Sequence, residues 1–278
     1  RRAEGNHLGN LGIAYRNLGR VEEAIGCHEQ ALVISREIGD RRGEGSILGN
    51  LGLAYADLGR VEEAIDYYEQ ALVISREIGA SYIEGHVLAY SARTKNSMGD
   101  SGVALVIATE ALTIGDEIKN SECQAEALSA LIPAQLQSGA LAEAWAAASR
   151  TLGLDYPFLN HQLAALRGVT ALRCERREDA TVAFNQTLTA AADLLAQSDQ
   201  LYAAQQSRGL ALAGLALCRA QAGADAAVLI DEAVAAYRAA RAITAAPGIV
   251  QAALMALGLL DGVPGAEILA PVRVAAAG

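Results

Sequence analysis

A repeat of 40 residues constrains this chain more than any other feature of its sequence. Residues 1–40, laid over residues 41–80 without a gap, are identical at 30 positions. The same frame continues through residues 81–120 and holds to about residue 152, and the residues it keeps are mostly small or apolar. Self-similarity at this period is typical of one supersecondary unit stacked many times. The 278 residues are therefore expected to form an array in which each unit packs on its neighbours.

Each copy of the repeat reads as two amphipathic helices joined by a turn. In the second copy Leu48, Leu51 and Tyr55 recur at three- and four-residue spacing, which places them on one helix face. Gly59 ends that helix, and a second apolar stripe follows over residues 64–78. Each copy is therefore predicted to be a helical hairpin.

The composition favours the same architecture over the whole chain. Hydrophobic residues make up 52% of the chain but aromatic residues only 4%, and no window alternates with a period of two. We predict an all-α fold of about thirteen helices, with about six hairpins stacked into a right-handed superhelix and a C-terminal capping segment. The expected divisions are regular repeats over 1–152 (1–40, 41–80, 81–120 and 121–152), degenerate hairpins over 153–245 and a helical cap over 246–278.

Six residues of the second copy carry a resemblance to a known family. They are the small and large apolar residues that recur in each hairpin, namely Leu48, Gly52, Tyr55, Ala64, Tyr68 and Ala71. This array resembles the tetratricopeptide repeat (TPR), and the long second helix with its IGD or IGA ending is similar to the 40-residue variety. That variety occurs in kinesin-light-chain-like and polarity adaptors and in the C-terminal sensor arms of bacterial signalling ATPases of the STAND/NB-ARC type. The usual proline near the end of the second helix is missing, because Arg76 stands there.

The repeat pattern fades after residue 152 but still allows two hairpins. The fifth copy is fitted by Gly168, Ala180, Phe184 and Thr187, and the sixth by Gly214, Ala226, Ile230 and Ala233. Arg176 and Arg177 are expected in the fifth turn, where earlier copies have glycine, and residues 193–200 are expected to form a linker. Because stability in such arrays is a sum of local and nearest-neighbour contributions, we expect the region after 152 to exchange its amide hydrogens first.

Net charge and motifs exclude several classes of function. The net charge of −10 and the scattered arginines and lysines disfavour nucleic acid, which attracts concentrated positive charge. The four cysteines lie far apart without a CxxC pair, as expected of single thiols in a reducing cytoplasm. No apolar stretch reaches the length of a membrane span. We therefore expect a cytoplasmic protein that contacts neither nucleic acid nor membrane.

Catalytic motifs are absent from the sequence. It contains no GxxxxGK[ST] phosphate loop and no HExxH zinc motif. Paired carboxylates such as Glu62 and Glu63 recur with the repeat in the first turn of a helix, where the helix dipole favours them. We therefore expect neither an enzyme nor a cofactor or metal.

Polar side chains on the first helix of each hairpin are the candidate binding residues. The resemblance implies that these helices line the concave groove of a tetratricopeptide stack. Asparagine offers both a donor and an acceptor to the backbone of an extended peptide. Arg16 and Arg93 would pair with acidic side chains or a terminal carboxylate. The predicted peptide-binding residues are Asn6, Asn10, Arg16, Asn17, Asn50, Asp57, His86, Tyr90, Arg93 and Asn96.

The resemblance implies a protein–protein interaction module and leaves its setting open. One hypothesis is the ligand-recognition arm of a larger bacterial signalling protein. The alternative is a free-standing cytoplasmic adaptor, and a solvated groove without a ligand also remains open. The opening RRAEG matches RRGEG at the start of the second copy, and further protein is therefore expected upstream, through which the parent could oligomerise.

Overall fold

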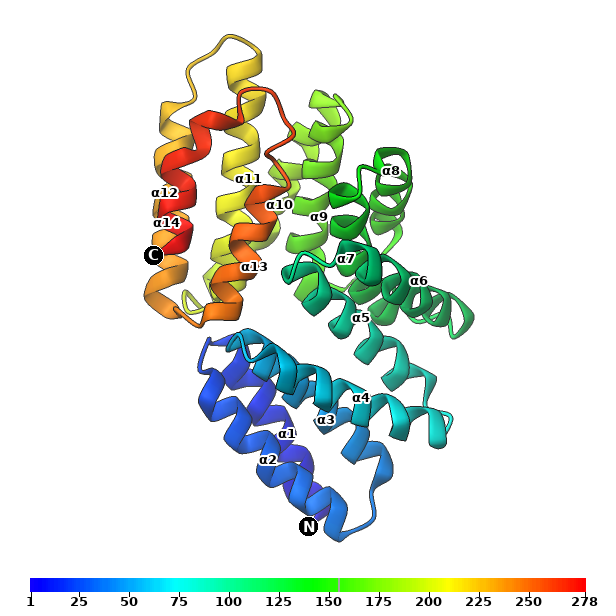
Figure 1. Cartoon of the computed structure of the whole chain (residues 1–278). Coiled ribbons are helices and arrows are strands. Elements are labelled where there is room, and N and C mark those ends of the chain that lie inside the picture. Colours follow the sequence, from blue (N-terminus) through cyan, green and yellow to red (C-terminus); the bar gives the residue numbers. More distant parts are fainter. Residues whose placement is uncertain (155) are drawn as a thin grey trace. The chain divides into compact units, whose positions relative to one another are not determined.

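The chain folds almost entirely into helices. The computed structural model describes residues 1–154 and 156–278, and these contain fourteen α-helices, two short 3-10 helices and no strand (Figure 1). The α-helices are α1 (Arg2–Asn17), α2 (Val21–Glu37), α3 (Arg41–Asp57), α4 (Val61–Glu77), α5 (Ser81–Ser97), α6 (Ser101–Glu117), α7 (Ser121–Gln137), α8 (Leu141–Arg150), α9 (Pro157–Arg173), α10 (Arg177–Gln197), α11 (Tyr202–Gln221), α12 (Ala227–Ile243), α13 (Pro247–Gly258) and α14 (Ala270–Ala277). The 3-10 helices are η1 (Thr151–Gly153) and η2 (Ala266–Leu269). The all-α prediction is confirmed, and the count exceeds thirteen because the cap contributes two helices.

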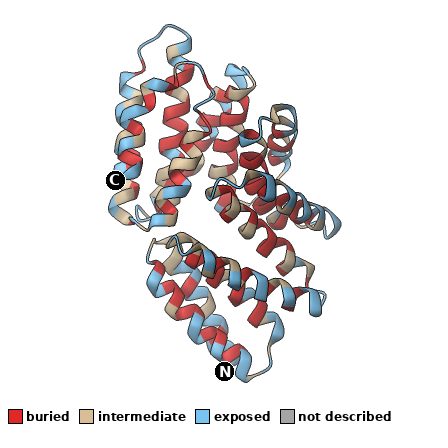
Figure 2. Cartoon of the chain, in the orientation of Figure 1, coloured by how far each residue is buried: buried red, intermediate tan, exposed pale blue. Residues whose placement is uncertain are grey.

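Consecutive helices pack as antiparallel pairs. The pairs α1/α2, α3/α4, α5/α6, α9/α10 and α11/α12 have extensive contacts, and α2, α4 and α10 also pack on the helix that follows each of them. Buried residues follow the inner faces of the pairs, and the turns are exposed (Figure 2). Each hairpin thus buries its apolar stripes partly against its own second helix and partly against the next hairpin.

A ring packed against a glycine holds several of these pairs close together. A Cβ at Gly52 would lie 2.5 Å from the ring of Tyr68, so only glycine leaves room for that side chain. Sixteen positions separate this glycine from its ring, and the same spacing recurs for His28 at Gly12 and Phe184 at Gly168. The sequence pattern of small and large residues therefore marks the close approach of the two helices.

Turns between the helices use left-handed residues, and here one prediction is wrong. Gly59 has φ +78°, as expected of the glycine that ends α3. In the fifth turn the left-handed residue is Glu175, with φ +59°, while Arg176 precedes α10 and Arg177 is its first residue. The two arginines therefore do not replace the turn glycine; Glu175 does.

The sixth hairpin differs from its predicted register. The ring of Tyr237 lies against Gly209, whereas Gly214 packs on Phe184 of the preceding hairpin. Gly214 is therefore not the counterpart of Gly52. The expected linker over 193–200 is also shorter than predicted, because α10 continues to Gln197.

The chain divides into two compact units. The first comprises Arg1–Ala130 and Ala246–Ile249, and the second comprises Leu131–Ala245 and Val250–Gly278. All ten predicted binding residues belong to the first unit.

Candidate functional site

Four asparagines form an accessible row on the first two hairpins. Asn6, Asn10 and Asn17 lie on one stripe of α1, and Asn50 occupies on α3 the place that Asn10 has on α1. Asn6 and Asn10 are exposed, while Asn17 and Asn50 are half-buried. Within the described residues none of these four side chains makes a hydrogen bond, so their amide groups are available to a ligand. We call this set the asparagine row.

Arg16 and Asp57 form an ion pair that joins α1 to α3. The Arg16 Nε donates to Asp57 Oδ2 at 2.7 Å, and the side chains are 20% and 15% exposed. Such partial burial makes the pair better shielded from solvent than a typical surface pair. Both residues were predicted to bind peptide, and the structure brings them together as partners of each other.

Arg93 is likewise engaged with its neighbours. Its guanidinium lies 3.2 Å from Glu126 of α7 and 5.4 Å from the ring centroid of Tyr90, one helical turn before it. These contacts place a cation over an aromatic face and neutralise it with a carboxylate. Tyr90 and Arg93 therefore form one partly accessible cluster with Glu126.

Two of the predicted binding residues are buried. His86 lies between Tyr82 and Tyr90, with ring centroids 4.5 and 6.0 Å away. Burial lowers the pKa of His86, although Glu126 and Glu122 oppose the shift. Asn96 is buried and donates from Nδ2 to the carbonyl oxygen of Ala130 at 2.7 Å. Both side chains thus lie inside the stack, which leaves eight of the ten predicted residues at the surface.

Two residues of this face were missed by the sequence analysis. Ile13 is 42% exposed and lies between Asn10 and Asn17, so it adds an apolar contact to the asparagine row. The Tyr82 hydroxyl donates to Glu122 at 2.8 Å. Helical spacing could have identified both residues, because Ile13 follows Asn6 by two helical turns and Tyr82 precedes His86 by one turn, which places each on the same face as the predicted residue.

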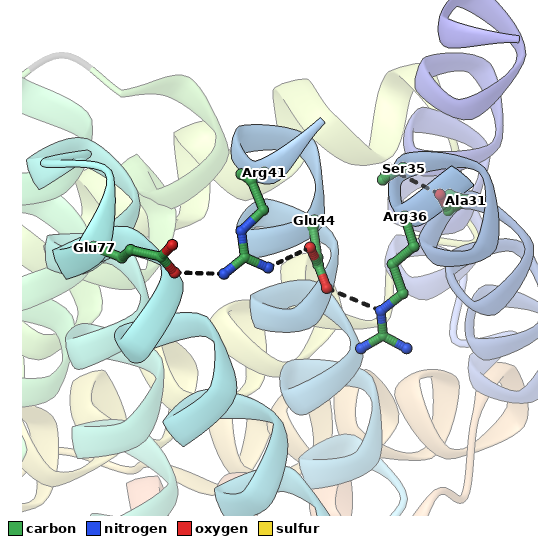
Figure 3. A network of polar contacts seen from close by, with 6 residues as sticks. All are labelled: Ala31, Ser35, Arg36, Arg41, Glu44 and Glu77. Atoms are coloured by element: carbon green, nitrogen blue, oxygen red, sulfur yellow. Dashed lines mark hydrogen bonds and ion pairs between the residues drawn. The ribbon is translucent and has the colours of Figure 1, made fainter. Parts of the chain in front are cut away.

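A separate polar network joins the first two hairpins (Figure 3). The Glu44 carboxylate of α3 accepts from Arg36 of α2 at 2.9 Å and from Arg41 at 2.7 Å, and Arg41 also reaches Glu77 of α4 at 2.5 Å. Burial raises the pKa of Glu44, but the two guanidinium groups outweigh it, and the pKa is lowered overall. The network fixes how one hairpin sits on the next.

The described residues offer no arrangement for metal chemistry. No group of three or more His, Cys, Asp or Glu side chains among them is placed to hold a metal ion. All four cysteines are free thiols, and burial raises the pKa of the Cys123 thiol to about 11, so it is a poor nucleophile at neutral pH. Among the described helices none is both long and apolar enough to cross a bilayer.

Stacked helix pairs that repeat the same side chains on the same face define a helical-repeat scaffold. The family model of the tetratricopeptide repeat matches residues 4–77, so these residues are tetratricopeptide repeats, as their resemblance predicted. No curated protein matches the chain.

Several solved structures resemble the fold at low sequence identity. One is a tetratricopeptide repeat protein from Parabacteroides merdae, at 15% identity and a TM-score of 0.45 over 99% of this chain and 100% of that one. Another is the TPR2AB domain of yeast Sti1 in a complex with pHSP90, at 17% identity and a TM-score of 0.41 over 99% of both chains. Yeast Tom70 matches at 13% identity and a TM-score of 0.32, over 92% of this chain and 51% of its own.

Proposed function

We propose that the asparagine row binds an extended segment of a partner protein. The repeat fold supports a scaffold for protein–protein interaction, and such scaffolds are typically not enzymes. The observation that carries the proposal is the pairing of Asn10 with Asn50. Both stand at the same place on successive helices, and neither side chain has a hydrogen-bond partner among the described residues. Each amide would donate to and accept from one peptide unit of the bound segment.

The charges beside the row favour a segment recognised by its backbone. Arg16 is neutralised by Asp57 and Arg93 by Glu126, so an acidic segment or C-terminal carboxylate would have to displace an existing carboxylate. Such an exchange gains less than pairing with an unoccupied arginine. We therefore rank a neutral extended segment, with an apolar side chain placed against Ile13, ahead of the acidic one.

Two settings for this binding are proposed. In the first, the chain is the ligand-recognition arm of a larger bacterial signalling protein. In the second, it is a cytoplasmic adaptor that joins two proteins. A nucleotide-binding domain in the parent polypeptide would favour the first setting.

A peptide display selection against the immobilised chain tests the proposal. Peptides that enrich are then titrated calorimetrically against the wild type, the double variant Asn10→Ala/Asn50→Ala and the matched control Asn185→Ala, whose side chain is exposed on α10. The double variant loses four neutral hydrogen bonds, two from each amide, and at about 1 kcal/mol each this predicts affinity weakened roughly 1,000-fold.

The control variant Asn185→Ala shows whether a loss of peptide affinity is specific to the asparagine row. It should bind the enriched peptides as tightly as the wild type, because Asn185 lies outside the asparagine row. If the double variant also retains full affinity, the asparagine row is not the binding surface. A selection that enriches no peptide contradicts the proposal as well.

A further inference from the structure

One face of α1 carries residues that are identical to buried residues of α3, although this face of α1 is exposed to solvent or only half-buried. The stripe runs along one face of α1 to its C-cap residue and comprises Glu4, His7, Leu11, Ala14, Tyr15 and Leu18. Five of these six residues are identical at the matching places of α3, where only Ile47 replaces His7. We call this set the open stripe, and it lies apart from the asparagine row on the same helix.

Burial differs sharply between the two matching stripes. On α3, Leu51 is 0% exposed and Ala54 and Tyr55 are also buried, whereas Leu11 on α1 is 43% exposed. Helix α2 packs on α3 and reaches both ends of the α3 stripe, since Arg36 contacts Glu44 and Glu29 lies 3.5 Å from the Tyr55 hydroxyl. Four identical side chains are thus buried in the second copy and exposed or half-buried in the first, whereas Leu18 and Leu58 are both half-buried.

A polar pair marks every interface between the first four copies. Arg36 donates to Glu44 at 2.9 Å, and Arg76 donates to Glu84 at 2.6 Å. At the third interface the matching residues are Asp116 and Gln124, 2.8 Å apart. The two residues of each pair are eight positions apart in the sequence. Glu4 occupies the place of Glu44, and its side chain is 54% exposed against 9% for Glu44.

The polar network around Glu4 on α1 lacks only one residue of the network around Glu44. Arg1 pairs with Glu4 at 2.9 Å and Glu37 at 2.5 Å, as Arg41 does with Glu44 and Glu77. Only the counterpart of Arg36 is lacking among the described partners of Glu4. An incoming helix with an arginine at that place would complete the network that Figure 3 shows around Glu44.

A terminal repeat that faces solvent ordinarily carries a polar outer face, because its apolar stripe would otherwise remain unburied. The open stripe keeps its leucines and tyrosine instead, with His7 as the one polar exchange. An apolar stripe retained in this way is typical of an interaction surface.

We propose that the open stripe is one half of a repeat-to-repeat interface, and that its occupant is a further helical hairpin of the same 40-residue kind. The occupant presents the face that α2 presents to α3. Ile25, Glu29, Leu32 and Arg36 define this face of α2 by their spacing. Glu29 and Arg36 reach α3, and the two apolar residues of the same face, Ile25 and Leu32, are buried. The inference does not rest on peptide binding by the asparagine row.

An extended chain tests the proposal directly. A second copy of residues 1–40 is joined ahead of Arg1, so that Asp40 precedes Arg1 as it naturally precedes Arg41. We expect circular dichroism to show two added helices, and hydrogen exchange of the α1 amides to slow by about tenfold or more, since covering one leucine-sized side chain changes an equilibrium by about that factor. Leu11→Lys in the extended chain should abolish the slowing, whereas Val33→Lys, at a residue 55% exposed on α2, should leave it intact.

Three results would overturn the proposal. The first is an added copy that stays unfolded, and the second is a folded copy that leaves exchange in α1 unchanged. The third is a stable dimer of the unextended chain that Leu11→Lys dissociates in sedimentation velocity, because a second copy of the chain would then be the occupant. A monomeric unextended chain, together with slowed exchange in the extended one, supports the hairpin.

Discussion

The first two hairpins and the hairpins from α9 to α12 share rings packed against glycines, but only the first two hairpins add a polar network that repeats with the sequence. In α1–α4 the contacts repeat with the sequence: Arg1 and Arg41 each bridge two carboxylates, and Arg36 and Arg76 each reach the following hairpin. In α9–α12 the rings of Phe184 and Tyr237 pack against glycines as in the front, but no such repeated polar network occurs among the residues described there. Register in the front is therefore specified many times over, whereas in the rear it depends on a few residues.

Phe184 provides the largest expected effect in this comparison. Its side chain is fully buried, and its ring lies against Gly168 of α9 and Gly214 of α11. We expect Phe184→Ala to destabilise the rear hairpins by about 4 kcal/mol, because a large cavity opens between three helices. Hydrogen exchange should show α9–α12 opening while α1–α4 keep their protection, since energy in repeat arrays is local.

The matched control for this variant is Val182→Ala on the same helix. Val182 is 58% exposed, so its truncation should change stability by no more than about 0.5 kcal/mol. Loss of protection along the whole chain in Phe184→Ala would contradict the local picture. The wild type should already open first after residue 152, and uniform protection would contradict that expectation.

The same contrast explains which parts of the fold were predictable. Helix ends in α1–α4 followed from Gly59 and its counterparts because each signal occurs in more than one copy. The register of the sixth hairpin could not be predicted, because α11 contains two glycines and only packing shows that Gly209 accommodates the ring of Tyr237. The left-handed Glu175 could not be predicted, since nothing in its side chain favours that conformation.

The candidate site was predictable in place but not in exposure. Period and spacing put all ten residues on the first helices of the hairpins. The burial of His86 and Asn96 depends on α7 of the next copy, where Glu126 and the Ala130 carbonyl meet them. The ion pair between Arg16 and Asp57 could not be predicted either, because its two residues lie on different copies of the repeat and belong to no shared motif.

The second largest expected effect is a loss of stability of the first two hairpins on acidification, which is caused by His28. Its ring is fully buried against Gly12, and neither ring nitrogen has a hydrogen-bond partner among the described residues. Burial lowers the pKa of His28 to about 4, with a smaller contribution from Arg16. Between pH 6.5 and 4 the unfolded chain binds a proton that the folded chain does not, so stability falls as the pH falls, by about 3 kcal/mol in total.

The variant His28→Phe isolates this contribution. Phenylalanine already occupies the matching place in the fifth copy, where Phe184 packs on Gly168. Denaturation of the first unit, followed at pH 7 and pH 4.5, should show less loss on acidification in the variant than in the wild type. His161→Phe is the comparison, because burial also lowers the pKa of His161 to about 4 but its Nδ1 lies 2.8 Å from the Ser207 hydroxyl. If wild type and His28→Phe lose the same stability on acidification, His28 is not the cause of the acid sensitivity.

Arg241 on α12 is expected to weaken the rear hairpins. All three of its guanidinium nitrogens are buried, and no hydrogen-bond partner for them occurs among the described residues. Burial lowers the pKa of Arg241, which reflects the cost of keeping its charge there. Arg241→Met retains the apolar stem and should stabilise the second unit by about 1–2 kcal/mol in chemical denaturation. Arg238→Met, on the exposed side of α12, should change little, and a clear destabilisation by Arg241→Met would show that the charge is compensated.

The smallest expected effect belongs to the ion pair between Arg16 and Asp57, and it distinguishes a structural pair from a ligand-binding one. The two side chains lie on successive hairpins and are largely shielded from solvent, so a double-mutant cycle of Arg16→Met and Asp57→Asn should give a coupling of about 1 kcal/mol. The exposed pair Arg20–Glu23, within one helical turn, is the control and should show no measurable coupling. Because the Arg16–Asp57 pair joins α1 to α3, its loss should increase exchange in α1 more than in α4. A coupling near zero would mean that Asp57 binds Arg16 only weakly. An acidic segment could then pair with Arg16, and it would no longer rank behind a neutral segment as a ligand for this face.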